Sequence, residues 1–533
     1  MISESACTAL KPVHLTQCKE RSSMFISRFT KLFFAILLFF IFVSPLSWAE
    51  NQMVYTRLAI MPFKNLTGDN DKNWLGEGIS DTVATELGSI KGLILIERSQ
   101  LAKAVEELKL SHSGLLDEKT AIKVGKLTSA KYLVVGSYQM AEGDILMNAR
   151  LIDVESGGVQ QTARVKGSFK NIFELQDSLA KSTLSWINIT PSLMDIQRMK
   201  EAPTSRNINV LEFISRAREA YYAGRTDESE EWIKKTLAED SAQPDALLLQ
   251  GNIQERKGQY SPALGSYTSA AEIFKKNKDE KGYSKGLRYQ GSVLNSQGKN
   301  NEALRYYDQS LAISRNIGDE TGIADALMWT GNVYIDQSRF DEALPYFNQS
   351  LDLYRKTNDE RGIASALQGI GRILSEQERY DEALAYYNQS LAINIKHGYD
   401  TSGTLLNIAG IYYYRKQYYQ VLSYYNQVVD LKRKIGDEEG MAIVLGNTGK
   451  VLSMQGRYEE ALDYFTRSIN ISRNISNERA LAYTLWQMGD CYLFMRRNST
   501  AKTVFLEAAT HFEKVGDLKR ANHIRNFVRQ NLR

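Results

Sequence analysis

The stretch RYDEALAYYNQSLAI, Arg379–Ile393, decides the fold, because near copies of it recur along the chain. FDEALPYFNQSLDL begins at Phe340 and NNEALRYYDQSLAI begins at Asn300. The starts lie 40 residues apart, with one step of 38. A fixed period of this size is the signature of stacked structural repeats. More divergent copies begin at Tyr260, Tyr418, Tyr458 and Asn498.

Small residues occupy two fixed places in each copy. One precedes the start by nine residues and the other follows it by three, which lets two successive helices approach closely. Apolar residues between them recur at the helical period, for example Leu327, Tyr334 and Leu344. Each copy is therefore predicted to be a helix–turn–helix hairpin that packs on the next copy. The first small positions are Gly251, Gly291, Gly331, Gly371, Ala409, Gly449 and Gly489.

This pattern closely resembles the tetratricopeptide repeat (TPR), and its 40-residue copies are similar to the repeats of kinesin light chains. The resemblance implies an all-α superhelical solenoid of eight repeats over residues 207–515. Residues 516–533 form an amphipathic segment that suits a terminal capping helix. TPR proteins of this kind bind a partner protein or peptide in their concave groove, so the resemblance implies protein binding.

The N-terminus carries an export pattern. The apolar run Leu32–Val43 is followed by the sequence SWA at 47–49, which predicts a signal peptide over residues 1–49. A start at Met24 would give a leader of ordinary length. Glu50 follows the predicted cut, where lipid attachment would need a cysteine. We expect a periplasmic protein that is not lipidated and has no membrane span after cleavage; the alternative is an inner-membrane anchor made by an uncleaved leader.

Residues 50–190 alternate predicted strands and helices, so they are expected to form a mixed α/β domain. Thr56–Phe63 is predicted to be a strand and Trp74–Ile90 a helix. Three further strands follow Ala130, and we expect them to be short and polar. Residues 191–206 are bracketed by prolines and are predicted to be a linker.

This domain is similar to the one shared by the curli-secretion protein CsgG and the TolB N-terminal region. That likeness implies a docking or assembly module of the bacterial envelope without catalytic activity. The resemblance rests on Pro62, Phe63, Asn65, Gly68, Asp69 and AKYLVVGSY at Ala130–Tyr138.

Catalytic, cofactor-binding and metal-binding patterns are missing from the sequence. Five scattered histidines have no Cys or His partner at metal-ligand spacing, and only Cys491 lies outside the leader segment. No phosphate loop, nucleophile elbow or zinc-protease motif is found. The net charge of +4 is spread without a basic tract, so nucleic acid is not an expected partner. We therefore expect a protein that is not an enzyme.

The first helix of each repeat is expected to line the groove. Its outward positions are mixed and charged in the early copies and aromatic in the late ones. Large aromatic residues in a groove are the usual anchors of a protein contact; the alternative is that they pack between neighbouring repeats. The predicted partner-binding residues are Arg256, Arg288, Asn332, Asp336, Tyr413, Tyr414, Tyr483, Trp486 and Phe494.

Taken together, the sequence predicts a multidomain protein: an α/β domain followed by a TPR solenoid. Its expected function is a non-catalytic periplasmic scaffold or adaptor, with residues 50–190 docked to an envelope assembly and a partner held in the groove. Two alternatives stay open, a CsgG-type secretion component at the outer membrane and a small-ligand sensor.

Overall fold

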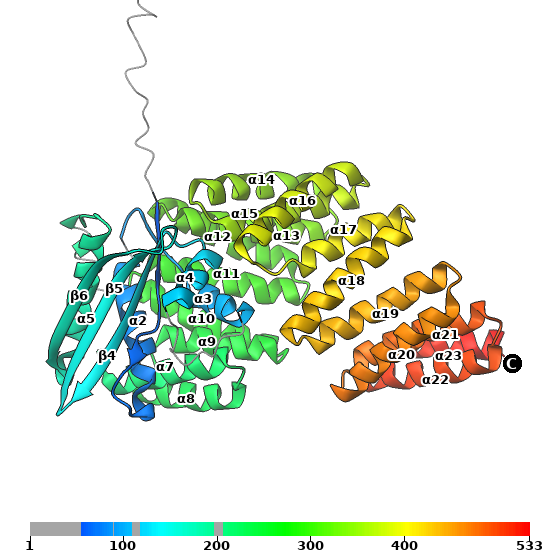
Figure 1. Ribbon diagram of the computed structural model, residues 1–533, viewed down its shortest axis with the longest axis horizontal. Coiled ribbons are helices and arrows are strands. Elements are labelled where there is room, and N and C mark those ends of the chain that lie inside the picture. The colour runs from blue at the N-terminus through cyan, green and yellow to red at the C-terminus, as the bar shows by residue number, and fades with distance from the viewer. Residues whose placement is uncertain (1–54, 89, 109–117, 194, 197–205, 533) are drawn as a thin grey trace, which may run out of the picture. The chain divides into compact units, whose positions relative to one another are not determined.

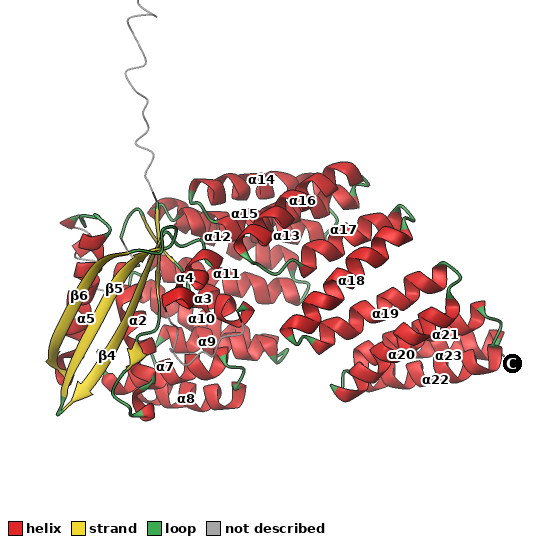
Figure 2. Cartoon of the chain, viewed as in Figure 1, coloured by secondary structure: helices red, strands yellow, loops and turns green. Residues whose placement is uncertain are grey.

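The computed structural model of the protein describes residues 55–88, 90–108, 118–193, 195–196 and 206–532 (Figure 1). The predicted signal peptide and residues 197–205 of the predicted linker lie outside these ranges. Tyr55–Arg533 form one compact unit. Within it, a domain that contains all the described strands precedes a long series of helix pairs (Figure 2).

The N-terminal domain is built on a six-stranded mixed sheet with the order β3-β1-β4-β5-β6 and β2 beside β4. Strand β1 runs parallel to β3 and β4, whereas β4, β5 and β6 form an antiparallel meander. The three meander strands have ten residues each, so the expectation of short strands was wrong. The strands are β1 Thr56–Ile60, β2 Lys64–Asn65, β3 Leu93–Leu95, β4 Tyr132–Ala141, β5 Asp144–Asp153 and β6 Val159–Ser168.

Helices cover both faces of this sheet. Successive residues of β1 face opposite sides: Leu58 and Ile60 join the core with α2 and α5, and Ala59 and Met61 join the core with α3 and α4. A strand buried on both sides explains the continuous apolar run of β1. The helices are α2 Trp74–Leu87, α3 Arg98–Glu107, α4 Glu118–Leu127 and α5 Ile172–Trp186, with short 3-10 turns η1 Asn70–Lys72 and η2 Phe169–Asn171.

Phe63 fixes the junction between β1, α2 and β4. Its ring lies so close to β4 that a Cβ at Gly136 would be 2.1 Å from the ring atom Cε1. A Cβ at Gly76 would be 2.1 Å from the carbonyl oxygen of Phe63. Both glycines are therefore required for α2 and β4 to approach this buried residue.

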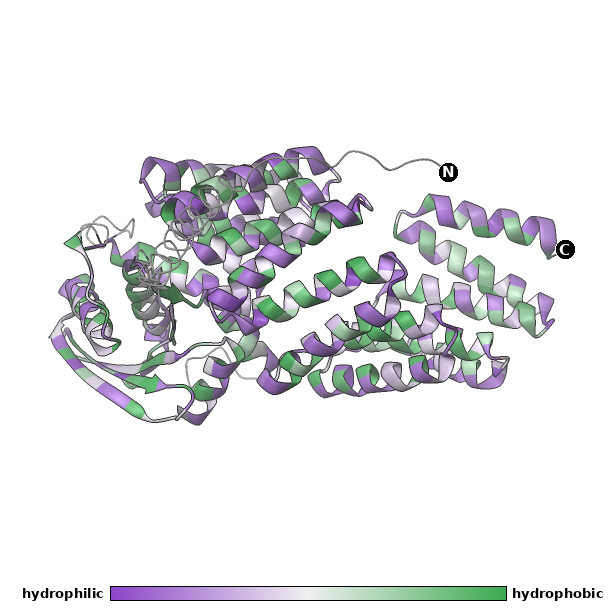
Figure 3. Ribbon diagram, turned by 90° about the horizontal axis from the view of Figure 1, so that it is seen from above, coloured by the Kyte–Doolittle hydropathy of each residue, from purple (hydrophilic) through white to green (hydrophobic). Residues whose placement is uncertain are grey.

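The described residues beyond Arg206 form eight consecutive helix pairs and one last helix. Each of these helices carries both apolar and polar residues, as Figure 3 shows by hydropathy. The first helix of each pair is called an A helix below, and the second a B helix. The pairs are α7 Ile208–Tyr222 and α8 Thr226–Glu239, α9 Pro244–Arg256 and α10 Tyr260–Lys276, α11 Glu280–Ser296 and α12 Asn300–Ile317, α13 Glu320–Asp336 and α14 Phe340–Lys356, α15 Glu360–Glu376 and α16 Tyr380–His397, α17 Ser402–Tyr414 and α18 Tyr418–Ile435, α19 Glu438–Met454 and α20 Tyr458–Asn474, and α21 Glu478–Phe494 and α22 Asn498–Lys514; α23 spans Leu518–Asn531.

The small residues pack within each pair as predicted. A Cβ at Gly331 would lie 2.7 Å from the ring of Phe347, and one at Gly371 would lie 2.7 Å from the ring of Tyr387. The A helix thus lacks a side chain where an aromatic ring of its B helix is buried. This close packing repeats along the solenoid and gives each hairpin its fixed geometry.

The extra residues of the 40-residue copies lengthen both helices of a pair, since the B helix α8 has 14 residues whereas α10 and α14 have 17. The helix α9 belongs to a 34-residue step and has 13 residues, whereas α11, α13 and α15 have 17. Asp359 caps the start of α15, because its side chain accepts a hydrogen bond from the N–H of Gly362 at 3.0 Å. The motif DE-x-G, which begins at Asp279, Asp319, Asp359 and Asp437, therefore marks the starts of α11, α13, α15 and α19.

Candidate functional site

The A helices of the early repeats hold the α/β domain. Helix α2 packs against α7 (Figure 1). The contact is tight at Gly78, where an added Cβ would lie 3.1 Å from the side chain of Leu211. The early part of the solenoid face is therefore occupied by the chain's own N-terminal domain.

A network of charges lies at this contact. Asp81 of α2 binds both Arg98 of α3 and Arg218 of α7, and Arg218 also pairs with Asp245 of α9 at 3.1 Å. Arg98 lies 3.3 Å from Glu77. Burial acts to raise the pKa of Asp81, but Arg218 and Arg98 outweigh it and hold that pKa below its usual value. The carboxylate of Asp81 thus stays ionised between two guanidinium groups.

A second, more buried ion pair joins β1 to a later repeat. The guanidinium of Arg57 lies 3.1 Å from the carboxylate of Asp359, and both side chains are less than 5% exposed. Arg57 also donates hydrogen bonds to the carbonyl oxygens of Thr128 and Ser129. The hydroxyl of Ser129 in turn lies 2.9 Å from the hydroxyl of Tyr399. The two ends of repeat five are therefore tied directly to the α/β domain.

Two outer ion pairs complete the junction. Lys285 of α11 lies 2.9 Å from Glu97, and Arg361 of α15 lies 2.6 Å from Glu107. The charge of Lys285 lowers the pKa of Glu97 to about 2. Burial acts in the opposite direction, and the hydrogen bond from Lys285 adds to the lowering. The junction thus combines paired charges with apolar contacts, such as those that Leu211 and Tyr399 make with the two cores of the α/β domain.

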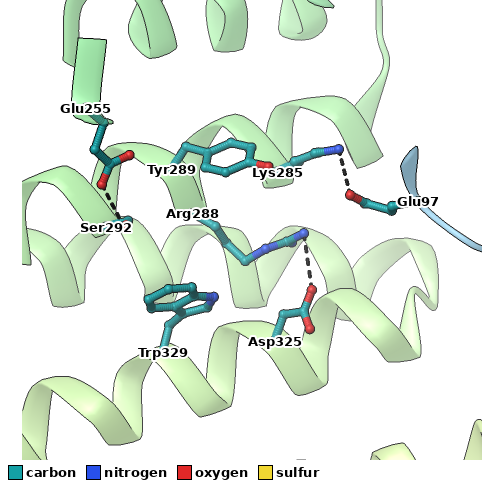
Figure 4. Close-up of a pocket in the computed structure, with 8 residues that line it drawn as sticks. All are labelled: Glu97, Glu255, Lys285, Arg288, Tyr289, Ser292, Asp325 and Trp329. Atoms are coloured by element: carbon teal, nitrogen blue, oxygen red, sulfur yellow. Dashed lines mark hydrogen bonds and ion pairs between the residues drawn. The ribbon is translucent and has the colours of Figure 1, made fainter. Parts of the chain in front are cut away.

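A cavity of about 210 Å³ lies where Glu97 meets α9, α11 and α13 (Figure 4). Its wall combines three carboxylates, two cations, one serine and two aromatic rings. Arg288 lies 3.6 Å from Asp325 across it. Burial raises the pKa of Asp325 to about 6, although Arg288 acts to lower it.

The early residues predicted to bind a partner have different environments. Arg288 lines the cavity, whereas Arg256 stacks on the ring of Tyr221 at 4.3 Å. Asp336 is exposed and accepts a hydrogen bond from Asn295 at 3.1 Å. Asn332 is half-buried on α13. Asn332 and Asp336 lie one turn apart on α13, whereas Arg256 and Arg288 lie on other A helices.

Three of the late residues lie on the exposed ends of A helices. Tyr414 is 65% exposed, and its ring stacks on Tyr380 of the preceding B helix. Phe494 is 61% exposed and stacks on Tyr458 in the same manner. Tyr413 meets the ring of Tyr414 edge-on, and its hydroxyl contacts the sulfur of Met454 at 3.4 Å. The equivalent residues Tyr414, Met454 and Phe494 are called the edge row below.

Tyr483 and Trp486 have a different environment. Both are half-buried, and their rings meet Phe512 of α22 edge-on, at centroid distances of 5.1 and 6.0 Å. Arg520 of α23 lies over the ring of Tyr483. These two aromatics pack against the B helix of their own repeat, and Tyr483 also contacts the last helix.

Sequence reasoning missed the residues that join the domain to the repeats, chiefly Arg57, Asp81, Glu97 and Asp359. Their partners lie far away in the sequence, and a single charged residue on a helix gives no local signal of a distant pair. Arg57 was the one visible anomaly, because it is a charged residue at the start of a strand that is otherwise apolar.

Across the described residues, no helix is long and apolar enough to cross a membrane. In the same part of the chain, no group of three or more His, Cys, Asp or Glu residues could hold a metal ion. The described cysteine, Cys491, is buried and free.

Family models agree with this architecture. Models described as "Tetratricopeptide repeat" match residues 214–278, 291–317, 322–396 and 400–474. A model described as "Curli production assembly/transport component CsgG" matches residues 54–142. A curated relative, "Putative adenylate cyclase 3" from Rhizobium meliloti (strain 1021), is 25% identical over 132 residues. That match covers 25% of this chain and only 21% of the relative.

Solved structures match this chain at low sequence identity. The crystal structure of a Rap protein complexed with Competence and Sporulation Factor is 13% identical, with a TM-score of 0.42, covering 68% of this chain and 92% of that one. Aspartyl phosphate phosphatase F from Bacillus subtilis is 14% identical, with a TM-score of 0.41, covering 62% and 88%. The protein thus carries tetratricopeptide repeats behind a CsgG-like N-terminal domain.

Proposed function

We propose that the protein is a non-catalytic scaffold that binds a partner protein or peptide through its late repeats, while its early repeats hold the α/β domain. The edge row carries this proposal. Tyr414, Met454 and Phe494 are 65%, 45% and 61% exposed, and they recur at one position of three successive A helices. Earlier repeats have polar residues such as Asp336 and Glu376 at that position.

Exposed apolar side chains in a row favour a protein contact over solvent. Each one leaves apolar surface in water that a partner would cover. The rings of Tyr414 and Phe494 are already stacked on neighbouring tyrosines, so little conformational freedom is lost on binding. Pre-ordered aromatic residues of this kind are typical binding hot spots.

The test is partner capture by the full protein and by a variant with Tyr414→Ala and Phe494→Ala. We expect the double variant to lose a partner that the wild type retains in its native host. Tyr419→Ala is the matched control, because Tyr419 is 81% exposed but lies on the B helix α18. Equal capture by the double variant and the wild type would overturn the assignment of the edge row.

The α/β domain is proposed to dock to an assembly of the bacterial envelope, with the protein located in the periplasm. The CsgG match over residues 54–142 supports this, as does the export pattern at residues 1–49. Strand β6 lies at an edge of the sheet and is largely exposed, so it could pair with a strand of an assembly partner.

Cell fractionation tests the proposed location. We expect the protein in the periplasmic fraction, with its N-terminus beginning near Glu50 by mass spectrometry. A full-length chain in the inner-membrane fraction would support the uncleaved anchor instead. Recovery of a cytoplasmic, uncleaved chain would contradict both.

A further inference from the structure

The cavity at the junction has an uncompensated carboxylate. Lys285 is paired with Glu97, and Arg288 with Asp325. Glu255 accepts hydrogen bonds from the hydroxyls of Tyr267 at 3.0 Å and of Ser292 at 3.5 Å. Among the described residues, no cation lies within ion-pair distance of Glu255. The wall of the cavity therefore carries one more negative than positive charge when its carboxylates are ionised.

Two aromatic rings line the same cavity and are held in place. Tyr289 stacks on the buried Tyr267 with a centroid distance of 5.1 Å, and Trp329 stacks on the buried Tyr307 at 6.3 Å. Figure 4 shows both rings bordering the space into which the side chain of Glu255 extends. The electron-rich face of an aromatic ring attracts a cation.

These features select for one kind of ligand. An inorganic cation would need several oxygen ligands close together, and among the described residues no group of three or more His, Cys, Asp or Glu side chains could hold one. An anion would meet Glu255 and gain nothing from the rings. A compact organic cation suits both the carboxylate and the rings, because its charge neutralises Glu255 and its apolar body covers the rings.

We propose that the cavity binds a small organic cation, an alkylammonium or guanidinium, with its charge at Glu255 and its body against Tyr289 and Trp329. Glu97 of the α/β domain forms part of the wall, so a bound ligand contacts both the domain and the repeats. Occupancy would then strengthen the junction, since a ligand that binds only the docked form stabilises it. This proposal is independent of the partner at the edge row.

Calorimetric titration of the purified full chain with choline and with agmatine tests the proposal. We expect at least one of them to bind with a dissociation constant of about 1 mM or tighter. Because the charge pair is lost while both rings stay in place, Glu255→Gln should weaken that binding about tenfold or more. Glu272→Gln is the control, since it removes the same charge from an exposed position of the same repeat.

A neutral ligand and a second variant test the roles of the charge and of the rings separately. The neutral isostere of choline, 3,3-dimethyl-1-butanol, should bind at least about tenfold more weakly than choline if charge matters. Trp329→Leu should weaken binding while leaving every carboxylate in place, which covers the case in which the Glu255 variant misfolds. The proposal is overturned if neither cation binds at 10 mM, which is roughly tenfold above the expected constant. Binding that both variants leave unchanged, or an isostere that binds as well as choline, would also overturn it.

Discussion

The early and late repeats share one hairpin geometry but present opposite chemistry. In the early half, A helices carry paired charges that meet the α/β domain, such as Arg218 with Asp81 and Lys285 with Glu97. In the late half, the equivalent helices end in exposed apolar residues, such as Tyr414 and Phe494. A repeated scaffold can thus bind its own domain through charge and leave apolar anchors for a partner.

The largest expected effect is at the buried pair of Arg57 and Asp359. Arg57→Met leaves a carboxylate in a site where both side chains are less than 5% exposed. We expect a loss of about 3–5 kcal/mol in the free energy of unfolding, measured by urea denaturation. Asp336→Asn, at an exposed position of α13, should change the free energy of unfolding by less than about 0.5 kcal/mol. A loss below about 1 kcal/mol for Arg57→Met would show that the junction does not depend on this pair.

Trp486→Ala is expected to have the next largest effect. The ring is half-buried against Phe512, so its removal should cost about 2 kcal/mol in unfolding free energy. Partner affinity should change little if Trp486 is a packing residue. A loss of affinity without a loss of stability would instead place Trp486 in the binding surface.

The edge row should show the reverse behaviour. Tyr414→Ala and Phe494→Ala should each leave the unfolding free energy within about 0.5 kcal/mol, because both residues are mostly exposed. Each should weaken partner binding by about 1–2 kcal/mol, measured by titration with the captured partner. Destabilisation of the repeats by either change would remove the distinction between packing and binding residues.

The smallest effect, and one that depends on pH, is expected at Lys285. The pKa of Glu97 is lowered to about 2 beside Lys285, so this pair stabilises the folded state above the ordinary glutamate pKa. That contribution should fade as the pH falls from about 4.5 towards 2. The melting temperature of Lys285→Met should lie slightly below that of the wild type at pH 7 and approach it in acid. A difference that stays constant over this range would contradict the assignment.

The sequence predicted the repeats well because their signal is local and periodic. Gly331 and Gly371 mark the places where a B-helix ring packs on the A helix, and the spacing alone located them. The exposed state of Tyr414 also followed from its place in the repeat. The half-buried state of Trp486 did not, because it depends on Phe512 in the next helix.

The junction could not be predicted for a physical reason. Asp81 and Arg218 lie 137 residues apart, and Arg57 and Asp359 lie farther still. Pairing over such distances depends on how the α/β domain sits on the repeats, which neither periodicity nor composition encodes. Charged residues are usually solvated, so the sequence gives no sign that these residues are paired. Only the structure shows which residues of the two surfaces pair.

We propose that the late A-helix ends bind a partner whereas the equivalent early positions do not. Site-specific photocrosslinking in the native host tests it most directly, with the photoreactive residue placed at Tyr414, at Phe494 or at Glu376, which holds the equivalent position in α15. We expect a protein adduct from Tyr414 and Phe494 and none from Glu376. An adduct from Glu376 alone, or equal adducts from all three positions, would contradict it.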